Sequence, residues 1–135
     1  FVTVFYGVLN TKTGEVTYSN AGHNPPYWVR RNGTPPSPLQ NQGGIVLGVM
    51  PEVTYVKNTI TLAPGECLFL YTDGVTEATN ERDEEYGMER LRALIPGLLD
   101  LGARKMIDAI VADVTAFAGS RPQFDDITLV VLKVR

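Results

Sequence analysis

The chain has 135 residues, a length typical of one domain. Hydrophobic residues make up 44% and charged residues 20%, which excludes a disordered chain. The net charge of −3 argues against a nucleic-acid-binding module, and no apolar run is long enough to form a membrane span. The single cysteine, Cys67, excludes an internal disulfide framework and a zinc ribbon.

The first half of the chain predicts strands. Residues 1–9 are apolar on both alternating faces, which is typical of a strand buried on both sides, and residues 15–20 complete a hairpin with it. Pro25 and Pro26 then mark a turn, because proline cannot donate a ladder hydrogen bond. The following segments predict a strand at 27–31, a loop at 32–44, a candidate strand at 45–49, a strand at 54–62 and a central strand at 67–71.

The second half predicts helices and one last strand. Residues 75–80 form a candidate short helix, and residues 87–99 predict a helix that is interrupted at Pro96. Residues 103–118 predict an amphipathic helix that ends at Gly119, with an apolar stripe of Ile107, Ile110, Val111, Val114 and Phe117. A loop at 120–126 leads to a buried strand at 127–134. This order predicts an α+β fold with a largely antiparallel sheet.

Acidic side chains stand at the ends of two very apolar strands. Asp73 closely follows the strand predicted at 67–71, while Asp125 and Asp126 come directly before the strand predicted at 127–134. If these strands are antiparallel neighbours, the carboxylates meet at one rim of the sheet, where they suit a hard cation such as Mg²⁺ or Mn²⁺. The alternative is that both sites are ordinary polar turns.

Several motifs resemble the protein phosphatase 2C-like family, and most closely its bacterial branch typified by the stage II sporulation protein E and RsbU-type regulators. The resemblance covers essentially the whole chain. Its most specific part is TDGVTEA, at residues 72–78, with DDITLVVL downstream, at residues 125–132. The other motifs that carry it are YSNAGHNPP, LGV and LAPGECLFLYTDG.

The resemblance implies both a fold and a reaction. The implied fold is an αββα sandwich of two antiparallel sheets flanked by helices. The implied reaction is hydrolysis of phosphoserine or phosphothreonine by a water that two Mn²⁺ or Mg²⁺ ions activate. The implied substrate is a phosphorylated regulatory protein such as an anti-anti-sigma factor. Together with the single cysteine and the lack of a signal sequence, the family also implies a cytoplasmic location.

The family's functional residues are carried over by position. Asp73 matches a metal ligand in the family's Asp-Gly motif, and Asp125 matches its C-terminal metal ligand. Asp126 is expected beside the metal site and not in direct contact with the ion. Gly74 allows a tight turn beside a cation.

The turn at residues 22–24 departs from the eukaryotic pattern. Eukaryotic relatives carry Gly-Asp-Ser, whereas this chain has Gly22, His23 and Asn24, the form usual in the bacterial branch. The resemblance places both His23 and Asn24 near the metal site. His23 could bind a metal, accept a proton or touch phosphate, because its unperturbed pKa lies near neutrality. Alternatively, His23 shapes the turn through local hydrogen bonds.

The family's bridging metal ligand has no counterpart in this sequence. We therefore expect residues 1–135 to be the C-terminal part of one catalytic domain, truncated at its N-terminus and weak or inactive as a phosphatase by itself. Exposed sheet edge and apolar surface would then favour a homodimer. Two other functions stay open at this point. One is a non-catalytic module that binds a phosphoprotein, and the other is a structural domain with acidic turns.

Overall fold

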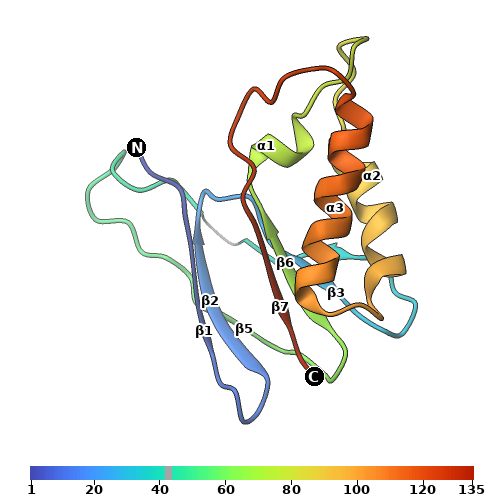
Figure 1. Ribbon diagram of the computed structural model, residues 1–135. Coiled ribbons are helices and arrows are strands. Elements are labelled where there is room, and N and C mark those ends of the chain that lie inside the picture. Colours follow the sequence, from blue (N-terminus) through green and yellow to red (C-terminus); the bar gives the residue numbers. More distant parts are fainter. Residues whose placement is uncertain (42–43) are drawn as a thin grey trace.

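Two antiparallel sheets and one layer of helices make up the computed structural model, which describes residues 1–41 and 44–135 (Figure 1). The first sheet has the strand order β1-β2-β5 and the second β4-β3-β6-β7. The strands are β1 (Val4–Leu9), β2 (Glu15–Ala21), β3 (Tyr27–Val29), β4 (Ser37–Pro38), β5 (Asn58–Thr61), β6 (Cys67–Tyr71) and β7 (Leu129–Lys133). The helices are α1 (Asp73–Thr76), α2 (Gly87–Leu94), the 3-10 helix η1 (Ile95–Leu98) and α3 (Ala103–Ala118).

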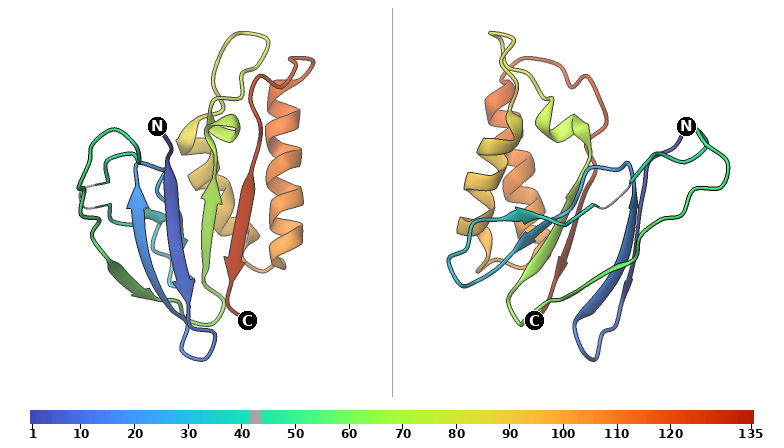
Figure 2. Two further views of the ribbon diagram at one scale, coloured as in Figure 1. Left: turned by 90° about the vertical axis from the view of Figure 1, so that its left-hand side faces the viewer. Right: turned by 180° about the vertical axis from the view of Figure 1, so that it is seen from behind.

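The predicted fold class is confirmed. The two sheets pack face to face, and α2 and α3 lie on the outer face of the second sheet (Figure 2). Within the described residues, helices cover one of the two outer sheet faces. The apolar residues between the sheets come from both of them: Val16, Tyr18, Leu62 and Leu68 are all buried.

A second core lies between the helices and the β4-β3-β6-β7 sheet. Phe69 of β6 is fully buried there, together with Leu91 of α2 and Ile110 of α3. The bounds predicted for α3 are confirmed, and the helix ends at Gly119. The apolar stripe predicted on α3 needs correction at Val111, which is exposed, whereas Met106 is fully buried, as expected for a residue on an apolar helix face. The buried positions Met106, Ile110 and Val114 are spaced by four residues, as one helix face requires.

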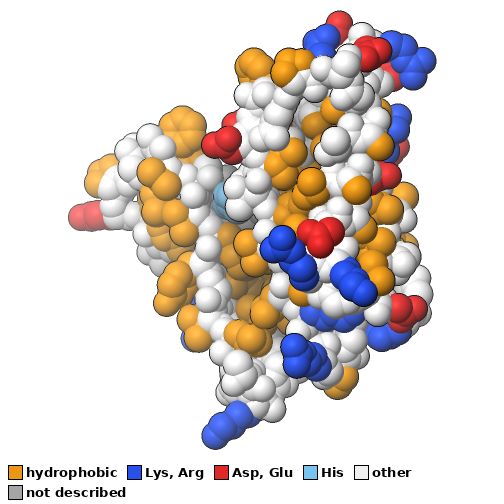
Figure 3. All heavy atoms as spheres, in the orientation of Figure 1, with side chains coloured by type: hydrophobic (Ala, Val, Ile, Leu, Met, Phe, Trp, Pro, Cys, Tyr) orange, Lys and Arg blue, Asp and Glu red, His pale blue; other side chains and the backbone are white. Residues whose placement is uncertain are grey.

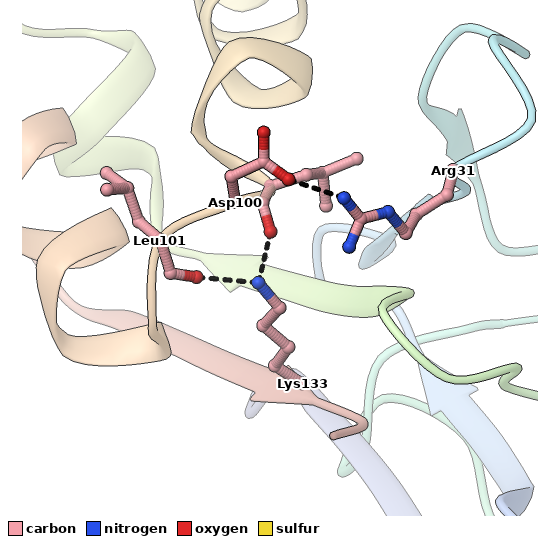
Figure 4. A network of polar contacts seen from close by, with 5 residues as sticks. Arg31, Asp100, Leu101 and Lys133 are labelled. Carbon is pink, nitrogen blue, oxygen red and sulfur yellow. Dashed lines mark hydrogen bonds and ion pairs between the residues drawn. The ribbon is translucent and has the colours of Figure 1, made fainter.

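Lys133 ties the last strand to the segment that enters α3. Its ammonium group donates hydrogen bonds to the carbonyl of Leu99 and, at 2.6 Å, to the carbonyl of Leu101 (Figure 4). Arg31 and Asp100 form an ion pair beside these contacts. These carbonyls lie where η1 has ended, so the lysine satisfies acceptors that the helix leaves open.

The prediction that residues 1–9 form a strand buried on both faces is wrong. The strand is β1, which lies at the edge of its sheet and pairs with β2. Tyr6 is 65% exposed and Val8 54% exposed. Figure 3 shows hydrophobic side chains over this sheet. The alternation was read correctly as a strand, but an apolar residue does not report by itself whether another layer covers it.

Other boundaries also differ from the predictions. Residues 45–49 form no strand beyond an isolated bridge between Leu47 and Val2, and β5 is shorter than the 54–62 prediction. The 32–44 loop contains β4, while its residues 42–43 lie outside the described part of the chain. The short helix predicted at 75–80 is instead α1, at Asp73–Thr76. The interruption predicted at Pro96 is confirmed as the change from α2 to η1. The strand predicted as buried at 127–134 is β7, an edge strand that leaves Val130 exposed.

Alkaline unfolding is expected to report on Cys67 of β6. Burial raises the pKa of its thiol from 9.0 to about 11, with Glu66 raising it further and Lys133 opposing the rise. The folded state therefore keeps a proton that the unfolded state loses. Stability from this group is complete below pH 9.0 and is lost as the pH rises through about 11. Urea midpoints measured across this range should fall less steeply for Cys67→Ala than for the unchanged protein.

Candidate active site

The two acidic strand ends meet at one rim of the second sheet. β6 and β7 pair antiparallel, with Tyr71 opposite Leu129, so the end of β6 lies beside the start of β7. The predicted meeting of these two strand ends at one rim of the sheet is thereby confirmed. The residues that line the resulting open cleft, called here the rim cleft, are Thr3, Gly22, His23, Asn24, Thr72, Asp73, Asp125, Asp126 and Thr128.

Thr72 connects the end of β6 to the segment before β7 by hydrogen bonds. Its hydroxyl donates to the carbonyl oxygen of Asp126 at 3.1 Å and accepts from the backbone N–H of Thr128 at 3.0 Å. Its own N–H donates to the carbonyl of Thr128 at 3.1 Å. Thr72 was not predicted as a site residue, although a hydroxyl side chain directly before Asp73 is visible in the sequence.

Gly74 allows α1 to pack directly onto the chain that carries Asp125 and Asp126. A Cβ atom at position 74 would lie 2.3 Å from the carbonyl oxygen of Asp126 and 3.1 Å from that of Asp125. Only hydrogen fits at this contact. Gly74 was expected to allow a tight turn beside a cation, whereas it lies inside α1 and its close partner is the backbone before β7.

Asn24 contacts Asp73 directly. The side-chain amide of Asn24 donates to Oδ1 of Asp73 at 2.6 Å, joining the turn after β2 to the start of α1. This bond holds one carboxylate oxygen of Asp73 in place, and so fixes the orientation of the whole carboxylate group. An oriented carboxylate binds a cation better than a freely rotating one, because the favourable geometry is already set.

Replacing Asn24 with alanine is expected to weaken Mn²⁺ binding by about tenfold, the lower end of the effect of removing such an orienting partner. The fold should be retained, since Asn24 lies in a partly exposed turn. Calorimetric Mn²⁺ titration checks this, with Asn32→Ala as a control at an exposed turn outside the rim cleft. Equal affinities for Asn24→Ala and the unchanged protein would contradict an orienting role.

Asp125 and Asp126 are both exposed but make different contacts. The carboxylate of Asp125 accepts a hydrogen bond from the backbone N–H of Asp126 at 2.8 Å, which fixes one of its oxygens. Gln123 donates its side-chain amide to the carbonyl of Asp125 at 2.8 Å. Asp126 meets Thr72 through its backbone carbonyl and not through its carboxylate.

His23 makes the local hydrogen bonds of a turn-shaping residue. Its backbone N–H donates to the side chain of Asn20 at 2.8 Å, and its carbonyl accepts from the Asn20 amide at 2.9 Å. Its ring Nδ1 lies 3.1 Å from the hydroxyl of Thr3. The ring also lines the rim cleft, so the structure leaves room for both roles considered from the sequence.

The donor atoms at the rim cleft suit a hard divalent cation. Asp73 and Asp125 offer carboxylate oxygens, the ligand type that Mg²⁺ and Mn²⁺ prefer. Across residues 1–41 and 44–135, however, no group of three or more His, Cys, Asp or Glu side chains forms a metal cluster. The residues present therefore fit part of a metal site.

In the same described ranges, no helix combines the length and apolarity needed to cross a bilayer.

The chain is similar to two curated bacterial proteins. It is 33% identical over 132 residues to Protein IcfG of Synechocystis sp., covering 98% of this chain and 20% of that protein. It is 30% identical over 135 residues to the phosphoserine phosphatase RsbU of Bacillus subtilis, covering 98% of this chain and 39% of that protein. The chain thus spans less than half the length of both relatives.

Solved structures share the fold. The phosphatase domain of the cell fate determinant SpoIIE from Bacillus subtilis matches with a TM-score of 0.73 at 18% identity, over 98% of this chain and 56% of that one. The SiaA-PP2C domain of Pseudomonas aeruginosa matches with a TM-score of 0.73 at 23% identity, over 90% and 47%. The sequence model described as stage II sporulation protein E (SpoIIE) matches residues 1–135. With that match over its full length, the chain belongs to the stage II sporulation protein E (SpoIIE) family.

Proposed function

We propose that residues 1–135 are the C-terminal part of one catalytic domain whose parent protein hydrolyses phosphoserine or phosphothreonine with Mn²⁺ or Mg²⁺. The observation that carries the proposal is the meeting of Asp73 and Asp125 in the rim cleft. Similarity to a relative named phosphoserine phosphatase supports the same chemistry. The substrate we propose is a phosphorylated regulatory protein of the anti-anti-sigma type, in the cytoplasm.

Asp73 and Asp125 are the residues that would hold the cation. When bound, the metal supplies Lewis-acid stabilisation of the phosphoryl group. The chain's own residues prepare the cleft: Asn24 orients Asp73, while Thr72 and Gly74 keep the two strand ends in contact. Asp126 is proposed to act beside the ligands and not as one of them.

The number of protein ligands in the rim cleft supports a metal site that is completed by residues outside this chain. Two protein carboxylates leave most positions around a six-coordinate cation to water or to other ligands. We therefore propose that further ligands come from outside residues 1–135, so that this chain alone binds two ions weakly and has little activity. Self-association through β1 remains part of the proposal, because its outer face carries exposed apolar side chains.

Calorimetric Mn²⁺ titration tests the proposal on this chain, on its Asp73→Asn variant and on the full-length protein. We expect strong binding in the full-length protein, weaker binding in the chain and a loss of binding with Asp73→Asn in both. Absence of Mn²⁺ binding in the full-length protein would reject catalysis. Retained binding of a phosphoprotein in that case would identify a non-catalytic recognition module.

A further inference from the structure

A second cleft adjoins the rim cleft and shares Asp125 with it. It lies between α1, the C-terminal end of α3 and the segment that returns to β7, which Figure 1 shows passing beside α1. Its volume is about 200 Å³, enough for one or two side chains. We call it the flanking cleft. Asp125 therefore borders both clefts.

The lining of the flanking cleft combines aliphatic and polar side chains and has an aromatic residue at its edge. Val114 of α3, which is buried, and Ile127 contribute aliphatic surface. Phe124 lies at the edge and is fully exposed, at 101% of the reference area. Single exposed apolar residues are common on proteins. Phe124 differs because it lines the same cleft as the aliphatic side chains of Val114 and Ile127 and adjoins the proposed metal ligand Asp125.

Two contacts between segments distant in the sequence stabilise the walls of the flanking cleft. Glu81 accepts hydrogen bonds from the hydroxyl and, at 3.4 Å, from the backbone N–H of Ser120. Arg121, which lines the cleft, forms an ion pair with Asp83. Both contacts join the 79–86 segment to the segment after α3. The cleft is therefore already formed without an occupant, which reduces the entropy cost of binding one.

We propose that the flanking cleft binds the residues next to the phosphoserine of the protein substrate and favours an apolar side chain there. The inference rests on the proposed function, because it takes phosphoserine to lie at Asp73 and Asp125. A serine side chain is short, so the substrate backbone must pass close to the rim cleft. An extended chain advances about 3.5 Å per residue, which brings a neighbouring side chain to the adjoining cleft.

Two phosphoserine peptides test the proposal, one with leucine and one with glycine on both sides of the phosphoserine. Fluorescence anisotropy measures their binding to the full-length protein without added metal, so that the peptides are not hydrolysed during the measurement. We expect the leucine peptide to bind about tenfold more tightly, the order expected from burying one apolar side chain. Phe124→Ala and Thr115→Trp should remove this difference, since Thr115 is an exposed α3 residue that lines the flanking cleft. Ala116→Trp is the matched control, at the next exposed position outside the cleft.

Hydrolysis separates this inference from the proposed function. Thr115→Trp should leave hydrolysis of p-nitrophenyl phosphate unchanged, because that substrate has no flanking residues, and should lower kcat/KM for the leucine peptide. Equal binding of both peptides by the unchanged protein, or unchanged leucine preference in Thr115→Trp, would overturn the inference. A protein that hydrolyses neither substrate with Mn²⁺ would reject the proposed function, while the binding comparison would still decide the role of the cleft.

Discussion

Replacing Asp125 with asparagine is expected to lower the Mn²⁺-dependent phosphatase activity of the full-length protein by about a hundredfold or more. Metal stabilisation of a phosphoryl group is worth several kcal/mol, and each 1.36 kcal/mol is a factor of ten in rate. Asparagine keeps the shape of the side chain but removes its charge. The backbone contact from Asp126 to position 125 can persist, so the fold should be unaffected. Initial rates on a phosphoserine peptide across Mn²⁺ concentrations measure the effect.

Asp126→Asn is the matched control for this prediction. Asp126 is the adjacent residue, is also exposed and carries the same charge. Its contact with Thr72 uses the backbone, which the substitution leaves in place. We expect a loss of activity much smaller than for Asp125→Asn. Equal losses in the two variants would mean that the cleft needs negative charge in general and not a ligand at Asp125.

Gly74→Ala is expected to destabilise the protein by about 1 kcal/mol and to inactivate the site. In a helix, alanine normally gains about 1 kcal/mol over glycine. Here the added Cβ would stand 2.3 Å from the carbonyl oxygen of Asp126, a contact that only a backbone shift can relieve. Such overpacking costs about 1–3 kcal/mol, so the clash outweighs the helix preference. The shift would also separate α1 from Asp125. Urea unfolding and peptide hydrolysis report the two effects.

Gly97→Ala provides the comparison. Gly97 lies in η1, and a Cβ atom there would have nothing within 4 Å. The substitution should be neutral or slightly stabilising, because only the unfolded chain loses freedom. A Gly74→Ala protein as stable and active as Gly97→Ala would show that the backbone at Asp126 can move at little cost.

Local sequence pattern was sufficient for much of the fold. The hydrophobic period identified α3 at its observed bounds, and Pro96 marked the change to a 3-10 turn. Both signals are local, since period and proline geometry act within a few residues. The exposure of β1 was not predictable in this way. Whether Tyr6 and Val8 are covered depends on which layers pack on their sheet, and alternation does not contain that information.

The candidate site was also predictable from the sequence only in part. The meeting of Asp73 and Asp125 followed from their places in the sequence, because one follows an apolar strand and the other precedes an apolar strand. It required only that the two strands be antiparallel neighbours. The hydrogen bond from Asn24 to Asp73 and the contact of Gly74 with Asp126 were not predicted. Both join segments distant in the chain, and their partners are set by the turn after β2 and the approach to β7.

The pairing of β6 with β7 has a consequence for folding cooperativity. Asp73 and Asp125 bracket the part of the chain that contains α1, α2 and α3. A cation held by both carboxylates would close that part into a loop, so that opening the helical layer would require release of the ion. Ligand concentration then contributes to the free energy of this local opening. Amide hydrogen exchange in α3 would slow on metal binding, although α3 itself supplies no ligand.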